Sequence, residues 1–349
     1  MGKRAADSEF EEVSLRTVPE LERQIESVVE CIGDNDSFLI AAHEEPDGDA
    51  IGSTLALGVM LQGLGKEVLM FNQDPVPYNC EFLAGAGAVA SQVPPDADFD
   101  VLVLLDCSEL ERLGESFPAS SEGDADTVVV IDHHKTIDEQ TADLYLCDSE
   151  AAATAELLYR LVAPIGAELT RDLAECLYCG LMTDTGSFQY SNTSRTTFRI
   201  AGELLEAGVE PWEMTMRILE SEPLRRIELL GEVLDTLTLS SCGRLAFIEI
   251  DREILGETER AAELTDGFIN YGRSIRGVEV STQLREREDG GWKVSFRSKG
   301  AVDVSRLASR FGGGGHHNAA GCVMEGPPAE IRSSLTRELT DILDDEETS

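Results

Sequence analysis

The chain has 349 residues, 42% of them hydrophobic, which is enough apolar material for the buried cores of two domains. Its 67 acidic residues outnumber 28 basic ones and give a formal net charge of -39. This self-repulsion predicts adaptation to high salt, where the screening length falls to about 3 Å at 1 M. No apolar run reaches the roughly 18 residues of a membrane helix, and the N-terminus lacks the apolar core of a signal peptide. We therefore expect a cytoplasmic protein without membrane contact.

Strands and helices alternate in the first half of the chain. We expect an opening helix over about 18–33, a strand over 37–43 and a helix over 49–65. Further short strands and then helical stretches follow, a pattern that indicates an α/β fold with a doubly wound, mostly parallel sheet. The further strands are 66–71, 100–106, 127–134 and 144–148, and the helical stretches are 150–162 and 170–182.

The second half begins with a helical, charged segment and continues as a smaller α+β unit. Apolar strands are expected at "RLAFIEI", "GVEVSTQLRERE" and "WKVSFRS", followed by "GGGGHHNAAGCVM" and a terminal helix. Among the eight cysteines the single CxxC pair is Cys176 and Cys179, which has neither a second pair nor a nearby histidine. Zinc is therefore not expected, and the helical spacing predicts two buried thiols.

Histidines and aspartates gather where the predicted strands of the first half end. The carboxyl ends of strands are where an open α/β sheet holds its ligands. Imidazole with several carboxylates is the ligand set of a pair of divalent cations, and its N/O character favours Mn²⁺ over calcium. The candidates are His43, Asp47, Asp49, Asp106, Asp132, His133, His134 and Asp184.

Each of these residues alone has a simpler explanation. An aspartate after a strand is more often a helix N-cap, and Asp49, just ahead of an apolar helical run, fits that alternative. A lone histidine is more often a hydrogen-bonded surface or core residue. The joint pattern decides against both explanations, because three of the five histidines and five aspartates fall at ends that this fold brings together. The sequence predicts a dinuclear metal site.

Five segments together resemble the signatures of the DHH/DHHA1 phosphoesterases, which belong to the RecJ-like superfamily. The resemblance covers about residues 20–343, and the two-domain length is similar to the nanoRNase/pAp phosphatase group within that family. The segments, in family order, are "HEEPDGDAIGS", "LLDCSE", "IDHH", "GLMTDTGSF" and "GGGGHHNAAG".

The resemblance implies two domains with the active site in the cleft between them. A DHH metal-binding catalytic domain is expected over 20–195 and a smaller α+β DHHA1 substrate-binding domain over 241–343. We expect a polar N-terminal segment over 1–19, a helical connector over 196–240 and an acidic tail over 344–349.

The resemblance also implies a role for each candidate at the strand ends. Asp132 orients a histidine, and His134 donates toward the phosphate. Two cations roughly 3.5–4 Å apart share an activated water and neutralise a leaving oxygen, so the implied reaction is phosphoester hydrolysis with Mn²⁺, or alternatively Mg²⁺. The implied ligands are His43 and Asp47 for one cation, Asp49, His133 and Asp184 for the other, and Asp106 as the bridge.

Basic residues concentrate in the second half of the chain. Four ligand aspartates would cancel the charge of two divalent cations, so other cations must hold an anionic substrate. Between Arg273 and Arg310 nine basic residues stand against five acidic ones. Taken alone, the glycine run favours a flexible hinge; with the family match, arginine's fork and an approachable backbone indicate phosphate binding. The predicted substrate-binding residues are Arg297, Ser298, Gly313, Gly314, Gly315 and His316, and His317 stays unassigned.

The function that the resemblance implies is a 3′–5′ oligoribonuclease that trims short RNA to 5′-mononucleotides, a phosphatase of 3′-phosphoadenosine 5′-phosphate (pAp), or both. The alternatives are a cyclic or linear di-AMP phosphodiesterase and a single-strand DNA exonuclease of RecJ type, although the chain has no room for the added OB-fold of the latter. A non-catalytic nucleic-acid-binding scaffold is disfavoured because every expected ligand is present. We expect short RNA or a nucleotide phosphate as the partner and leave a homodimer open.

Overall fold

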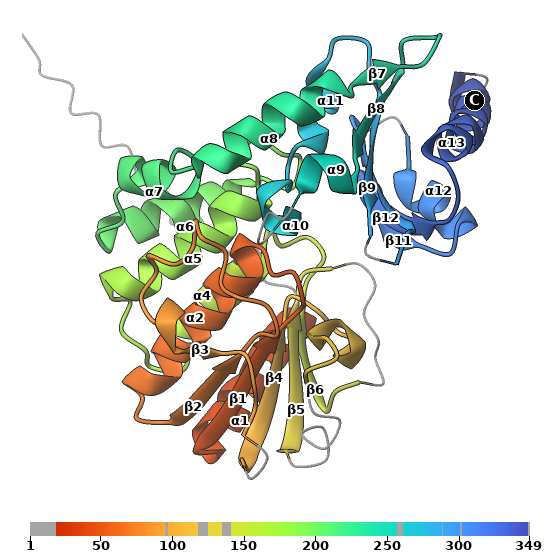
Figure 1. Cartoon of the computed structure of the whole chain (residues 1–349). Helices are drawn as coiled ribbons and strands as arrows, with labels where there is room; N and C mark the ends of the chain where they lie inside the picture. Colours follow the sequence, from red (N-terminus) through yellow and green to blue (C-terminus); the bar gives the residue numbers. More distant parts are fainter. Residues whose placement is uncertain are drawn as a thin grey trace, which may run out of the picture. The chain divides into compact units, whose positions relative to one another are not determined.

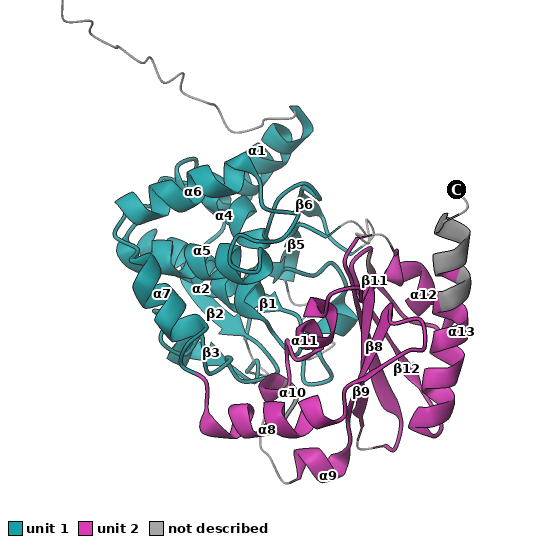
Figure 2. Cartoon of the chain, turned by 90° about the horizontal axis from the view of Figure 1, so that it is seen from above, with its two compact units in different colours: residues 1–221 teal, residues 222–349 magenta. Residues whose placement is uncertain are grey.

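The chain divides into two compact units, residues 1–221 and 222–349, and each is described by itself (Figure 2). Of the predicted N-terminal segment all but its last residue lies outside the described part, as do the last two residues of the predicted acidic tail. The computed structural model describes residues 19–94, 97–117, 125–134, 141–256, 261–287, 289–300 and 302–347.

Unit 1 is built on a sheet of six parallel strands (Figure 1). These strands are β1 (Ser37–Ala42), β2 (Glu67–Phe71), β3 (Val89–Ala90), β4 (Phe99–Leu105), β5 (Ala125–Asp132) and β6 (Leu144–Cys147). Their spatial order is β3-β2-β1-β4-β5-β6, so the chain first builds outward from β1 on one side and then on the other. The order reverses between β1 and β4, and such a switch point is where an open α/β sheet binds its ligands.

Long helices cover one face of this sheet, and shorter segments cover the other. The helices of unit 1 are α1 (Pro19–Asp34), α2 (Gly48–Gly63), α4 (Thr154–Val162), α5 (Arg171–Asp184), α6 (Arg195–Glu206) and α7 (Pro211–Ile218). α1, α2 and α4 pack on the strands, α5 packs on α2, and together they share one apolar core. On the opposite face Leu102, Leu104 and Val130 pack with Leu113 of the short helix η2 (Leu110–Leu113). β1, β4 and β5 are apolar because both of their faces are buried.

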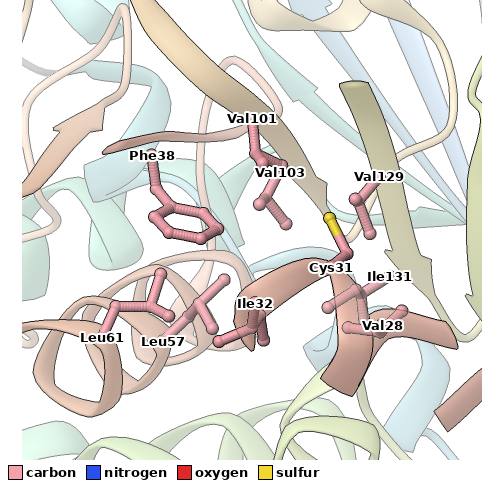
Figure 3. Close-up of a pocket in the computed structure, with 10 residues that line it drawn as sticks. All are labelled: Val28, Cys31, Ile32, Phe38, Leu57, Leu61, Val101, Val103, Val129 and Ile131. Atoms are coloured by element: carbon pink, nitrogen blue, oxygen red, sulfur yellow. The ribbon is translucent and has the colours of Figure 1, made fainter. Parts of the chain in front are cut away.

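A small cavity of about 10 Å³ lies between α1, α2 and the sheet (Figure 3). This volume is at the lower limit for one water molecule, and a buried water needs at least two polar partners. The lining offers none beyond a thiol, so the cavity belongs to the core and is no ligand site. Its lining residues are Val28, Cys31, Ile32, Phe38, Leu57, Leu61, Val101, Val103, Val129 and Ile131.

Unit 2 contains a mixed sheet of six strands. They are β7 (Thr238–Leu239), β8 (Leu245–Ile250), β9 (Val280–Glu286), β10 (Trp292–Ser298), β11 (Gly314–His316) and β12 (Ala319–Met324). The order is β11-β12-β10-β9-β8-β7; β8 and β9 pair in parallel and the other pairs are antiparallel. One face packs on α12 (Val304–Arg310) and α13 (Pro328–Glu347). The remaining helices are α8 (Leu224–Asp235), α9 (Arg252–Leu255), α10 (Ala261–Leu264) and α11 (Ile269–Ser274).

The predicted fold class is confirmed: a doubly wound parallel sheet precedes a smaller α+β unit. Of the helices expected as a connector over 196–240, α6 and α7 belong to unit 1 and α8 to unit 2. The prediction of buried thiols at Cys176 and Cys179 is also confirmed, and Cys179 Sγ lies 3.8 Å from Cys80 Sγ. Within the described residues no helix is both long and apolar enough to cross a membrane.

Candidate metal centre

His43 directly follows β1 and turns its ring toward the neighbouring strand. Its Nδ1 lies 2.8 Å from the carbonyl oxygen of Glu44, so a proton on Nδ1 leaves Nε2 as the metal-binding nitrogen. Nε2 lies 3.4 Å from Asp106 Oδ2. Asn72 holds the loop, because its Nδ2 donates to the carbonyl oxygens of Ala42 and His43 at 3.3 and 2.9 Å.

The two aspartates of this loop have different surroundings. Asp47 is exposed and is the N-cap of α2, where its Oδ1 accepts the N–H groups of Asp49 and Ala50 at 2.9 and 3.0 Å. The alternative that Asp49 is the cap is therefore wrong. Asp49 is 1% exposed, its Oδ2 accepts the N–H of Thr154 at 2.6 Å and its Oδ1 accepts that of Ala155 at 3.1 Å.

Asp106 follows β4 and lies between two groups of candidate ligands. Its φ is +58°, a left-handed conformation that few residues other than glycine adopt, and its N–H still donates to the carbonyl oxygen of Ile131 on β5 at 3.1 Å. Besides the contact of Oδ2 with His43, Oδ1 lies 3.5 Å from His133 Nε2. Two ligand atoms that bind one ion at about 2.1 Å are roughly 3.0–3.4 Å apart, so these separations fit a cation on either side of Asp106.

Two groups of three side chains, both containing Asp106, bring their ligand atoms within 4.8 Å of one another. The first is His43, Asp47 and Asp106, which is one complete set of predicted ligands. The second contains Asp106, His133 and His134. These groups concern the described residues, and each lies at the carboxyl edge of the parallel sheet.

The two histidines after β5 differ in what their Nδ1 atoms contact. His134 Nδ1 lies 2.6 Å from Asp132 Oδ1, which also accepts the His134 backbone N–H at 3.0 Å. Asp132 thereby fixes the ring of His134 through Nδ1. His133 Nδ1 lies 3.3 Å from the carbonyl oxygen of Ala151, and its Nε2 lies 3.7 Å from Asp184 Oδ2. The Nε2 of His133 thus lies beside the carboxylates of Asp106 and Asp184, whereas the Nδ1 of His134 lies against Asp132.

A strained turn follows Asp184, the last residue of α5. Gly186, Ser187 and Phe188 have φ values of +54°, +60° and +63°. Such conformations cost about 1–3 kcal/mol for a residue other than glycine and persist only where the surroundings enforce them. The Phe188 N–H donates to Thr185 Oγ1 at 2.9 Å, and the Ser187 N–H donates to the carbonyl oxygen of Met182 in α5 at 2.7 Å. The turn places the Asp184 carboxylate beside His133.

The buried titratable groups of this site shift one another's pKa values. Burial opposes the charged imidazole, but the hydrogen bond to Asp106 and the charges of Asp47 and Asp106 outweigh it and raise the pKa of His43 to about 9. Burial is likewise outweighed at His133 by Asp106 and Asp184, which raise its pKa to about 9. Burial would also raise the pKa of Asp106, yet the histidines hold that pKa well below its ordinary value. Burial raises the pKa of Asp184 to about 7.

The predicted phosphate-binding pair of unit 2 is separated by the sheet. Successive residues of a strand face opposite sides, so the side chains of Arg297 and Ser298 leave β10 on opposite faces. Ser298 is 2% exposed, and its hydroxyl donates to Asn318 Oδ1 at 2.9 Å. Arg297 pairs in register with Ser281 and Ala319 and is half-buried.

The glycines at the start of the β11–β12 hairpin differ in how much space surrounds them. A Cβ on Gly313 would lie 2.0 Å from the carbonyl oxygen of Gly321, and Gly315 has φ +134° with its Cβ position 2.6 Å from the carbonyl oxygen of Ala319. Gly314 has no atom within 4 Å of its Cβ position. The β11–β12 hairpin therefore requires Gly313 and Gly315, whereas Gly314, which pairs with Gly321, has open space beside its Cα.

Of the two histidines after the glycines, the structure describes His317 with its side chain and His316 by its backbone. The backbone of His316 pairs with Ala319, which in turn pairs with Arg297; its side chain lies outside the described part. His317, which the sequence left unassigned, has its Nε2 2.9 Å from the carbonyl oxygen of Gly300 and its Nδ1 3.7 Å from Asp303, the N-cap of α12. A structural contact thus accounts for His317.

The fold brings seven of the eight candidates of the first half together around Asp106, and Asp49 joins them through the start of α4. The sequence did not reveal Asn72, Thr154 or Asn192, which hold candidate ligands by hydrogen bonds. Thr154 precedes a helical run and is typical of an ordinary helix start. Asn72 and Asn192 carry no local pattern at all.

Comparison with known proteins places this site in a family. The model of the DHH family, N-terminal domain, matches residues 37–181, and that of the DHHA1 domain matches residues 257–345. The bifunctional oligoribonuclease and PAP phosphatase NrnA of Thermus thermophilus is 37% identical over 310 residues, which are 85% of this chain and 90% of that protein. The chain belongs to the DHH family.

Two further relatives extend this DHH family assignment. The Bacillus subtilis protein of the same name is 29% identical over 290 residues, 82% of this chain and 88% of that protein. A crystal structure of an exopolyphosphatase-related protein from Bacteroides fragilis superimposes with a TM-score of 0.81 at 28% identity, covering 90% of this chain and 96% of the other. The resemblance inferred from the five sequence segments is confirmed, and both predicted domains are present.

Metal binding should release protons, because a cation requires neutral imidazole while the pKa values of His43 and His133 in the metal-free chain are about 9. We expect Mn²⁺ affinity to rise from pH 6.5 to 8.5. Calorimetric titration in two buffers of different ionisation enthalpy measures the protons released. By the same linkage, the stabilisation from these groups is complete below pH 6.5 and is lost as the pH rises through about 9. A Mn²⁺ affinity that is independent of pH would contradict this.

Gly313 and Gly314, at the start of the β11–β12 hairpin, can be tested as a pair. Gly313→Ala should lower the free energy of unfolding by about 1–3 kcal/mol through overpacking against β12. Gly314→Ala should change it by less than about 0.5 kcal/mol, because the added methyl group meets open space. Urea unfolding at fixed KCl compares the two, and equal losses would mean that the hairpin geometry is wrong.

Proposed function

We propose that the chain is a metal-dependent phosphoesterase that hydrolyses short oligoribonucleotides to 5′-mononucleotides and removes a phosphate from pAp. Membership of the DHH family supports this, and the relatives from T. thermophilus and B. subtilis are named for both activities. The observation that carries the proposal is the pair of ligand groups that share Asp106 at the carboxyl edge of the sheet. A cytoplasmic, salt-rich setting, expected from the sequence, belongs to the proposal as well.

The donors in this site fit two divalent cations with Asp106 between them. When bound, such cations supply an activated water and neutralise the leaving oxygen of an in-line displacement. Imidazole nitrogens beside carboxylate oxygens favour Mn²⁺, whereas Mg²⁺ prefers oxygen donors and is the alternative. The proposed ligands are His43 and Asp47 on one side, Asp49, His133 and Asp184 on the other, and Asp106 for both.

The side chains around the cations hold and move protons. Asp132 accepts a hydrogen bond from His134 Nδ1 and so fixes the ring. Burial lowers the pKa of His134, but the hydrogen bond to Asp132 and the charge of Asp106 outweigh it, and the pKa is raised. A protonated ring then donates from Nε2 to the phosphate and stabilises the charge that develops as the ester bond breaks.

Binding of the substrate phosphate is assigned to unit 2. Arg297 supplies the charge, the open space beside the Cα of Gly314 lets a phosphate come close, and His316 stays a predicted donor. Ser298 also stays a prediction, although its hydroxyl is already bonded to Asn318. A hydrogen bond from a charged donor to a phosphate contributes about 1.5–3 kcal/mol to the binding free energy. Such a contact is needed because the metal site, whose charges cancel, does not attract an anionic substrate by itself.

A substrate panel tests the proposal directly. At fixed Mn²⁺ and high KCl, the rates for di- to pentaribonucleotides and pAp should exceed those for long RNA, single-stranded DNA, and linear and cyclic diadenylate. Removal of metal by a chelator should abolish every activity. A preference for cyclic diadenylate would instead assign a cyclic dinucleotide phosphodiesterase, and a preference for single-stranded DNA an exonuclease.

Asp106→Ala should abolish turnover and leave the protein folded. The carboxylate contacts ligands on both sides, and its loss relieves repulsion among the buried carboxylates of the metal-free site. Initial rates with a diribonucleotide and circular dichroism measure the two effects. Removing a residue that only supports ligands lowers activity by about 10- to 100-fold. A turnover above roughly a hundredth of that of the unchanged protein would therefore contradict the bridging role of Asp106.

Arg297→Ala and His134→Ala should affect different kinetic constants. Arg297→Ala removes a charged phosphate contact, so substrate affinity should fall by about 10- to 150-fold while the metals remain bound. His134→Ala removes a donor to charge that develops in the transition state, so kcat should fall more than KM rises. Steady-state kinetics at saturating Mn²⁺ and fixed salt separate the two. The opposite pattern would exchange the proposed roles.

A further inference from the structure

A five-residue segment just before and at the start of α4 contacts most of the proposed metal ligands. The segment is Ala151–Ala155, and each of its residues is at most 3% exposed. None of them is a predicted ligand, and four are alanines. The backbone of the segment contacts His133 and Asp49, and the hydroxyl of Thr154 contacts Asp106. The side-chain amide of Asn192 links the segment to Asp184.

Thr154 contacts two carboxylates at once. Its Oγ1 donates to Asp106 Oδ1 at 2.9 Å, and its backbone N–H donates to Asp49 Oδ2 at 2.6 Å. The N–H of Ala155 reaches the other oxygen of Asp49 at 3.1 Å. Because Asp49 belongs to α2 and Asp106 follows β4, this one residue joins three elements of the fold.

Asn192 joins the same segment to another ligand. Its Nδ2 donates to the carbonyl oxygen of Ala152 at 2.9 Å and lies 3.1 and 3.2 Å from the carbonyl oxygen and Oδ2 of Asp184. Next to it, the carbonyl oxygen of Ala151 lies 3.3 Å from His133 Nδ1. The segment therefore sets the orientation of an imidazole and of carboxylates that come from distant parts of the chain.

Helix capping does not account for Thr154. A capping threonine accepts N–H groups of its own helix, but the N-cap of α4 is Ala153, which makes no side-chain bond. The Thr154 hydroxyl instead donates to a carboxylate on another element and is fully buried. Water cannot replace a donor lost at a buried position, so the orientation of Asp106 depends on this bond.

We propose that Thr154 and Asn192 are positioning residues of the metal centre. Thr154 holds Asp106, and Asn192 holds Asp184, in the orientation in which both face His133. The inference rests on the proposed metal centre but concerns residues outside the predicted ligand set. Partners that orient ligands in this way typically change metal affinity by 10- to 100-fold when removed.

The test measures Mn²⁺ binding to the metal-free full-length protein by calorimetry. Thr154→Val keeps the backbone N–H and nearly the same volume but removes the hydroxyl, and Asn192→Leu removes the amide. Each should raise the Kd for Mn²⁺ by about 10- to 100-fold. Thr154→Ser keeps the hydroxyl and should restore an affinity close to that of the unchanged protein. At saturating Mn²⁺ both losses should lower kcat for a diribonucleotide and leave KM nearly unchanged.

Matched controls separate positioning from general destabilisation. Thr54 is equally buried, but its hydroxyl donates to the carbonyl oxygen of Ala50 at 2.8 Å, so Thr54→Val should not change the Kd. Asn35 bonds the carbonyl oxygen of Cys31 at 2.8 Å, so Asn35→Leu is the control for Asn192.

The outcomes distinguish this inference from the proposed function. If the unchanged protein binds no Mn²⁺, the metal centre and the positioning roles both fail. If it binds Mn²⁺, two outcomes overturn only the positioning roles. In one, Thr154→Val and Asn192→Leu bind Mn²⁺ as tightly as the unchanged protein; in the other, the control variants lose as much Mn²⁺ affinity as these two. If circular dichroism shows that Thr154→Val does not fold, the Kd of Asn192→Leu for Mn²⁺ provides the test, because Asn192 is only half-buried.

Discussion

Buried carboxylates that share a small volume are the constraint on which unit 1 depends. Asp49 and Asp106 are 1% and 3% exposed, and burial, together with the charges of Asp106 and Asp184, raises the pKa of Asp49 well above its usual range. Two like charges 4 Å apart repel by about 4 kcal/mol at an effective dielectric constant of 20, so the fold must supply positive charge or N–H donors beside them. In the metal-free chain, the raised pKa values of His43 and His133 provide that charge as protons. Divalent cations would replace these protons.

The parallel sheet meets this constraint through the direction of its strands and helices. Every strand of the sheet ends at the same edge, so residues that follow β1, β4 and β5 converge there. The starts of α2 and α4 lie at this edge as well, and their N–H groups bind the carboxylates of Asp47 and Asp49. Left-handed backbone at Asp106 and at residues 186–188 completes the arrangement.

In unit 2, the residues of one short motif have different surroundings. Gly313 and Gly315 are required by the close pairing of β11 with β12, whereas Gly314 is open. His317 and Ser298 are bonded within the unit, to Gly300 and to Asn318. A short motif that resembles a phosphate-binding signature therefore contains residues that build the hairpin and others that present a surface. Only the second kind can change substrate binding without changing stability.

The sequence by itself determined the fold class, the carboxyl edge and nearly all candidate ligands. Apolar strands followed at once by aspartate or histidine, as at Asp106 and His133, carry that information locally, because strand direction alone brings such ends together. Only the tertiary structure decided that Asp47 rather than Asp49 is the cap, and that Thr154 orients carboxylates. Thr154 binds residues 48 and 105 positions away, and hydrogen bonds over such separations leave no periodic or local pattern in a single chain. They exist only once separate elements have packed.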